Sequence, residues 1–105
     1  MIRATILTRG EQLCGFEIQG HAGFAEQGRD IVCAAVSSAA YLTANTLTEV
    51  CGCRAKVSEK EGRLSVIVSP EEEKAAQVTL KGLQLHLDGL SAQYPKYIQL
   101  QLTEV

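Results

Sequence analysis

The fold is set by the stretch LCGFEIQGHAGFAEQGRDIVCAAVSSAAYLTANTLTEVCG (residues 13–52), in which a strand pattern, a loop and a helix pattern follow one another. Every second side chain from Cys14 to Ile18 is apolar, and this period of two predicts a half-buried strand over residues 13–19. Residues 20–29 contain three glycines and follow neither the strand period nor the helix period. We therefore expect a loop there, and a loop of this length in a small domain is often functional.

Asp30 comes directly before the helix pattern and is a favourable N-terminal cap. Its carboxylate can accept hydrogen bonds from the unpaired amides of the first helical turn. We expect the helix to run from Ile31 to Val50 and to be ended by Gly52, because glycine readily adopts the left-handed conformation that closes many helices. The segment is rich in alanine and serine, so it can pack closely against a sheet or another helix.

Outside this stretch the chain predicts more strands and a second helix. Alternating apolar residues and intervening turns predict strands at Ile2 to Thr8, Cys53 to Lys60, Arg63 to Ser69 and Tyr97 to Thr103. Ser69, Pro70 and Glu72 are typical of a helix start, with the serine as cap and the glutamate completing a capping box. An apolar stripe at helical spacing follows, formed by Leu80, Leu83, Leu87 and Leu90. The order β-β-α-β-β-α-β predicts a single α+β domain over residues 1–105, with both helices packed on a largely antiparallel sheet.

The composition is that of an ordinary soluble globular protein, since 46% of the 105 residues are apolar and 21% are charged. The net charge of −2 argues against a protein that chiefly grips nucleic-acid phosphates, so we expect no direct binding of nucleic acid. The segment from Ile31 to Thr48 is uncharged but carries many hydroxyl and amide groups. We expect it to be a buried helix rather than a membrane span, and we expect no membrane partner.

The four cysteines allow a disulfide framework, a metal site or a reactive thiol. The N-terminus has the pattern of a strand and not of a secretion signal, so we expect a cytoplasmic protein with reduced thiols. Cys14 and Cys53 are in phase with apolar strand residues, and both are expected to be small buried side chains. Cys51 and Cys53 lack the second ligand pair that structural zinc usually needs, so we expect neither a metal nor another cofactor.

Cys33 is different, because it is expected at the third position of the helix that Asp30 caps. The free amides and the positive end of the helix dipole favour a thiolate at this position. His21 lies in the loop that leads into the helix, and an imidazole is the usual base beside a nucleophilic cysteine. The pattern predicts a catalytic pair, with the alternative that Cys33 is a core residue and His21 a surface residue.

The motifs GHAG (residues 20–23) and GRDIVCAAVS (residues 28–37) resemble the ribosomal-processing cysteine proteases of the Prp family, whose order of elements is similar along nearly the whole chain. The resemblance implies a homodimeric enzyme of Firmicutes and related bacteria. It implies removal of a short N-terminal extension from the precursor of ribosomal protein bL27, by cleavage after a phenylalanine. It further implies that Cys33 is the nucleophile and His21 the general base, and Asp30 and Ser37 match two further polar positions of the motif.

Several roles stay open at this level. Asp30 either orients His21 or only caps the helix, and Ser37 either bonds within the site or only packs. Amides at the start of the helix near Cys33 are the expected oxyanion site. We also expect the loop to open for substrate, with Gly23 and Gly28 as its flexible points.

The alternative function is that of a non-catalytic, dimeric binding module that docks on ribosomal protein or RNA. Its best feature is a set of basic residues on the second hairpin, Arg54, Lys56, Lys60 and Arg63. Acidic residues interrupt this set, which is more typical of a solvated hairpin face. A thiol-redox or metal protein built on Cys51 and Cys53 is the least favoured alternative.

Overall fold

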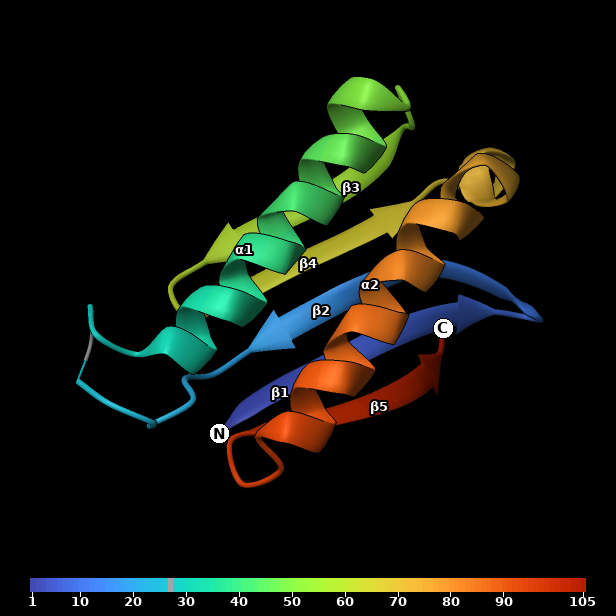
Figure 1. The fold of residues 1–105 in the computed structure, drawn as a ribbon. Coiled ribbons are helices and arrows are strands. Elements are labelled where there is room, and N and C mark those ends of the chain that lie inside the picture. The colour runs from blue at the N-terminus through green and yellow to red at the C-terminus, as the bar shows by residue number, and fades with distance from the viewer. Residues whose placement is uncertain (27) are drawn as a thin grey trace.

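The computed structural model describes residues 1–26 and 28–105, and its elements follow the predicted order. Figure 1 shows two long helices covering the same face of one sheet, which confirms the α+β class. In chain order the elements are β1 (Ile2–Arg9), β2 (Gln12–Gln19), α1 (Ile31–Asn45), the π-helical turn η1 (Thr46–Val50), β3 (Ala55–Lys60), β4 (Arg63–Val68), the 3₁₀ turn η2 (Pro70–Glu72), α2 (Glu73–Gln93) and β5 (Ile98–Glu104).

The five strands are ordered β3-β4-β2-β1-β5 across the sheet. Strands β1 and β2, β2 and β4, and β3 and β4 pair antiparallel, whereas β5 pairs parallel with β1. The sheet is therefore largely antiparallel, as predicted. The loop that links β2 to α1 lies at the end of the sheet where α1 begins (Figure 1).

The core lies between the helices and the covered face of the sheet. Phe16 on β2 and Val66 on β4 are fully buried there, as expected for neighbouring residues on one face of paired strands. From α2, the predicted leucine stripe contributes three buried side chains, Leu80, Leu83 and Leu87. Burial of these groups provides the main driving force that holds both helices on the sheet.

Residues Ile31–Val50 form a helical segment whose length and mean hydropathy of 1.3 also suit a membrane span. Composition alone, including the hydroxyl groups of this segment, does not distinguish a membrane helix from a helix packed in a protein core. Val32, Val36 and Leu47 are buried in the protein core. One side of the segment therefore packs in the core, while Ile31, Leu42 and Val50 are exposed.

The predicted ends of this helical segment are confirmed, but its last turn is wider than an α-helix. Asp30 caps the first turn, and Gly52 follows the last turn with a left-handed φ of +66°. The amide of Cys51 donates to the carbonyl of Thr46 at 2.8 Å, which spans five residues as in a π-helix. The hydroxyl of Thr46 donates back to the carbonyl of Leu42 at 2.7 Å, a contact that often bends helices.

The predicted capping box at the second helix is wrong. The side chain of Ser69 makes no capping hydrogen bond, and its amide donates to the carbonyl of Arg54 at 2.9 Å. The carboxylate of Glu72 accepts from the backbone amide and from Nε of Arg54, at 3.3 and 3.0 Å. Glu72 is thus bound to a guanidinium, a charge-assisted partner, and the helix starts as a 3₁₀ turn before α2 begins at Glu73.

The predicted start of the third strand at Cys53 is also wrong, because β3 begins at Ala55. Cys53 is nevertheless buried as expected, and its amide donates to the carbonyl of Leu47 at 2.8 Å. Val57, one of the apolar strand residues in phase with Cys53, is 49% exposed. Strand β3 is the edge of the sheet, so its side chains are covered only in part.

Candidate active site

Cys33 is held at the start of α1 by hydrogen bonds to Asp30. Oδ1 of Asp30 accepts from the amide of Cys33 at 2.9 Å, and the Asp30 carbonyl accepts from the amide of Ala34 at 3.0 Å. The Cys33 amide bond is the largest cause that holds the pKa of Asp30 below its ordinary value of 3.8, because it favours the charged carboxylate. The thiol of Cys33 is therefore placed on a capped, rigid helix end.

His21 is held by the turn between β3 and β4. The amide of the preceding residue, Gly20, donates to the carbonyl of Gly62 at 2.9 Å. A Cβ added at Gly62 would lie 3.7 Å from Nε2 of His21, so the imidazole borders this turn. A Cβ added at Gly20 would lie only 2.5 Å from the carbonyl oxygen of Met1, so the backbone before His21 leaves no room for a side chain.

Cys33, His21 and Ser37 together line two adjoining cavities. The larger, of about 360 Å³, is otherwise bounded by the loop and the first turn of α1: Gly23, Ala25, Gly28, Asp30 and Ala34. The smaller, of about 180 Å³, extends toward the β3–β4 turn and is otherwise bounded by Ile18, Gly20, Ala40, Tyr41, Lys60, Gly62, Arg63 and Leu64. The three predicted residues thus meet where two hollows join, a shape that leaves room for a chain on both sides of the thiol.

In this structure, Asp30 contacts the loop backbone and not the imidazole. Its Oδ2 accepts from the amide of Phe24 at 3.1 Å, and no hydrogen bond joins Asp30 to His21 among the described residues. The thiol of Cys33 and the imidazole of His21 are not hydrogen-bonded to each other within that part of the chain either. The amides of Cys33 and Ala34 already have acceptors in Asp30, so the expected oxyanion donors are occupied in this conformation.

The remaining cysteines differ from Cys33 in their surroundings. All four thiols are free, and burial raises the pKa of the Cys14 and Cys53 thiols. Cys51 is exposed, and it lines none of the cavities of the described structure that contain His21. Over residues 1–26 and 28–105, no three His, Cys, Asp or Glu side chains are grouped so that they could hold a metal ion.

Salt bridges neutralise part of the basic hairpin that favoured a binding module. Nε of Arg54 lies 3.0 Å from Glu72, and Nη2 of Arg63 lies 3.0 Å from Glu17. Two of the four basic side chains of the hairpin therefore have carboxylate partners. This weakens the case for a phosphate-binding surface.

Two contacts near the site were not anticipated from the sequence. The hydroxyl of Tyr41 on α1 donates to the carboxylate of Glu59 on β3 beside the smaller cavity. Phe24 in the loop packs edge-to-face against Tyr94 and Tyr97. Each contact joins residues far apart in the chain, and no local pattern reports such a pairing.

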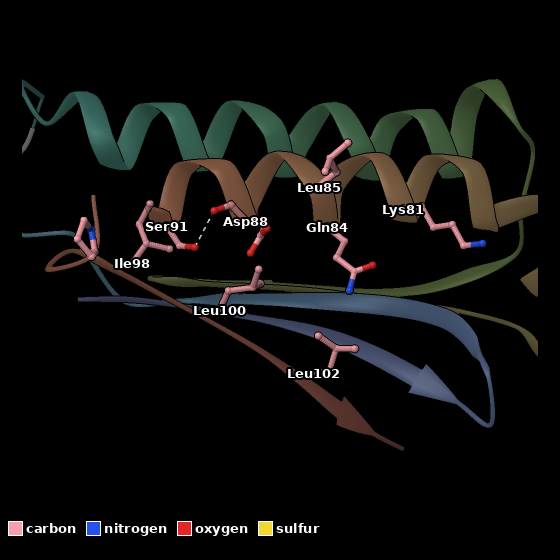
Figure 2. Close-up of a pocket in the computed structure, with 9 residues that line it drawn as sticks. Lys81, Gln84, Leu85, Asp88, Ser91, Ile98, Leu100 and Leu102 are labelled. Atoms are coloured by element: carbon pink, nitrogen blue, oxygen red, sulfur yellow. Dashed lines mark hydrogen bonds between the residues drawn. The ribbon is translucent and has the colours of Figure 1, made fainter. Parts of the chain in front are cut away.

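A cavity of about 540 Å³ between α2 and β5 is larger than either hollow at Cys33 (Figure 2). Leu100 and Leu102 of β5 and Leu85 of α2 are among the residues that line it. The hydroxyl of Ser91, which also lines the cavity, donates to the backbone carbonyl of Asp88 at 2.9 Å. This groove contains none of the predicted site residues, and it brings no imidazole to a nucleophile.

Comparison with known proteins shows which proteins share this sequence and this fold. Residues 1–99 match the family described as cysteine protease Prp. The ribosomal processing cysteine protease Prp of Bacillus subtilis is 30% identical over 101 residues, which cover 90% of each chain. The essential ribosomal processing protease Prp from S. aureus, solved with a covalently linked product peptide, has the same fold: the TM-score is 0.90 at 24% identity, over 98% of this chain and 100% of that one. A Streptococcus mutans structure matches with a TM-score of 0.84 at 26% identity, over 100% of this chain and 99% of that one.

Proposed function

The chain belongs to the cysteine protease Prp family, and on that premise we propose that it removes the N-terminal extension from the precursor of ribosomal protein bL27 by cleaving after a phenylalanine. The observation that carries the proposal is the meeting of Cys33, His21 and Ser37 where two cavities join. An extended precursor tail can lie through both cavities, with the residues on either side of the cut bond on opposite sides of the thiol. The ribosomal processing role named for the Bacillus subtilis relative supports a ribosomal protein as substrate.

In the proposed reaction, Sγ of Cys33 attacks the carbonyl carbon of the cut peptide bond and forms a tetrahedral intermediate. His21, as the imidazolium, gives its proton to the leaving amine as the carbon–nitrogen bond breaks, which leaves a thioester on Cys33. Water then loses a proton to His21 and attacks the thioester carbonyl. The carbon–sulfur bond breaks, the new carboxyl end of the extension departs, and the Cys33 thiolate and the His21 imidazolium are restored.

Asp30 and Ser37 support this pair in different ways. Asp30 holds the first turn of α1 through the amide of Cys33 and holds the loop through the amide of Phe24. Ser37 stands one turn after Cys33 and borders both cavities, so its hydroxyl is available to a substrate backbone. We assign both residues supporting roles and no proton transfer.

The proposed enzyme works as a homodimer in the bacterial cytoplasm, without a cofactor, and needs neither nucleic acid nor a membrane. Its partners are the bL27 precursor as substrate and a second copy of the chain. The family match supports a peptide substrate, and the paired arginines of the hairpin favour a protein substrate over RNA.

Incubation with a bL27 precursor, followed by mass analysis of the products, tests the proposal. We expect the wild-type protein and Cys51→Ala, which removes an exposed thiol outside the site, to release an extension that ends in phenylalanine. Cys33→Ala should release none, and His21→Ala should be slower by a factor of about 10² to 10⁴, the range for loss of a general acid–base group. Circular dichroism checks that each variant is folded. Cleavage by folded Cys33→Ala at the wild-type rate would refute the proposal.

A further inference from the structure

The loop that carries His21 is held against the C-terminal end of α2 by the ring of Phe24. The centroid of this ring lies 5.9 Å from that of Tyr94 and 5.2 Å from that of Tyr97, with interplanar angles of 80° and 76°. Both are edge-to-face contacts, the geometry in which aromatic rings attract each other. Phe24 remains 41% exposed, so core burial alone does not account for a phenylalanine at this position.

The two tyrosines stand on a turn that is fixed to the rest of the fold. The amide of Tyr94 donates to the carbonyl of Leu90 in α2 at 2.8 Å, and the amide of Tyr97 donates to the carbonyl of Tyr94 at 3.0 Å. The carbonyl of Tyr97 accepts from the amide of Ile2 at 2.9 Å. The surface that receives Phe24 is thus tied to a helix and to the central sheet.

The backbone of Phe24 is also connected, through Asp30, to the first turn of α1. Its amide donates to Oδ2 of Asp30, whose other oxygen accepts from the amide of Cys33. Gly23 and Gly28 have no side chains to anchor the loop, and a Cβ added at either would meet none of the described residues within 4 Å. Between the β3–β4 turn and Asp30, the loop is therefore attached to the fold by the aromatic contact together with the buried side chain of Ala22.

We propose that Phe24 is a positioning residue of the protease, whose ring, seated on Tyr94 and Tyr97, keeps the loop in the place where His21 faces Cys33. This role rests on the proposed Cys33/His21 pair but not on the identity of the substrate. Phe24 acts through His21 and does not touch the reacting atoms. Without the ring, the loop would spend part of its time in a conformation in which His21 no longer faces Cys33. The catalytically competent conformation would then be less populated.

Two measurements on Phe24→Ala test this role. We expect kcat for the precursor to fall about tenfold with little change in KM, the factor that loss of about 1.4 kcal/mol of aromatic contact produces. Iodoacetamide should alkylate Cys33 more slowly near neutral pH, because a displaced imidazolium no longer stabilises the thiolate. Phe24→Tyr, which keeps the ring, should recover most of both losses. Leu85→Ala is the matched control, since it truncates an exposed apolar side chain on α2 away from the site.

The positioning role is refuted if folded Phe24→Ala keeps the wild-type kcat and alkylation rate while only its melting temperature falls. It is also refuted if KM rises at unchanged kcat, because Phe24 would then bind the substrate. The alkylation rate needs no peptide, so it tests Phe24 even where the precursor is not cleaved. A wild-type protein that leaves the precursor intact would contradict the proposed substrate instead.

Discussion

Replacement of Gly20 by alanine is expected to lower both stability and activity. Gly20 has a left-handed φ of +92°, and a Cβ there would lie 2.5 Å from the carbonyl oxygen of Met1. This oxygen belongs to the peptide unit whose amide, that of Ile2, donates to the carbonyl of Tyr97, so it cannot swing aside as the end of a flexible side chain can. The backbone before His21 must therefore move, and the imidazole must move with it.

Gly10 provides a matched control for the backbone cost. It also has a left-handed φ, +65°, but a Cβ there would meet nothing within 4 Å. An alanine in the left-handed conformation destabilises the folded state by about 1–2 kcal/mol. The stiffer unfolded chain offsets about 0.4–1 kcal/mol of this, so we expect Gly10→Ala to lower the free energy of unfolding by about 1 kcal/mol. Gly20→Ala must also relieve the collision, which raises its expected loss to about 2–4 kcal/mol.

Urea unfolding followed by circular dichroism gives both free energies, and precursor cleavage gives kcat. In a domain of this size each kcal/mol lowers the melting temperature by about 4–8 °C, so the two variants are separable by thermal unfolding as well. Gly10→Ala should keep its kcat, because its turn lies away from His21. If Gly20→Ala is as stable as Gly10→Ala, or keeps the wild-type kcat, the contact with Met1 does not position His21.

Two further predictions concern the thiols and the response to acid. Iodoacetamide should label Cys51 in the native protein but should label Cys14 and Cys53 only after the protein unfolds, because burial shields both thiols and raises their pKa. Labelling of Cys14 in the native protein, detected by mass spectrometry, would contradict this. The amide of Cys33 holds the pKa of Asp30 below its ordinary 3.8, so the stabilisation is complete above that pH and is lost as the pH falls through the lowered pKa. Asp30→Asn should remove this part of the acid dependence of unfolding by urea; the same pH dependence in both proteins would show that the cap does not depend on charge.

The sequence predicted those parts of the fold that depend on neighbours in the chain. The cap at Asp30 and the helix end at Gly52 were found because each needs only one residue of suitable chemistry at one position. The capping box at Ser69 failed because a guanidinium from Arg54, distant in the sequence, binds the carboxylate that the motif requires. The local pattern was present, and a nonlocal partner outcompeted it.

The site was predictable to the same extent. Cys33 was proposed as a site residue from its place in the first helical turn and His21 from the loop before it, whereas their placement around the same cavities beside the β3–β4 turn depends on the bond from Gly20 to Gly62. The proposed role of Phe24 could not be predicted from the sequence. An aromatic residue in a glycine-rich loop gives no indication of which part of the fold it contacts.

These attachments differ in strength between the two members of the pair. Cys33 belongs to a helix whose inner side is buried in the core and whose first turn is capped, so its position changes only when the domain loosens. His21 lies in a loop that is attached by the backbone hydrogen bond from Gly20 to Gly62, by the buried side chain of Ala22 and by the ring and amide of Phe24. Its other described residues are largely exposed, and such a loop opens at a lower free energy than the core. Substitutions in the loop should consequently reduce kcat at nearly unchanged global stability, whereas core substitutions should reduce both together. In the proposed mechanism the imidazole is the adjustable half of the pair, and this would allow a peptide to enter between loop and helix without disturbing the thiol.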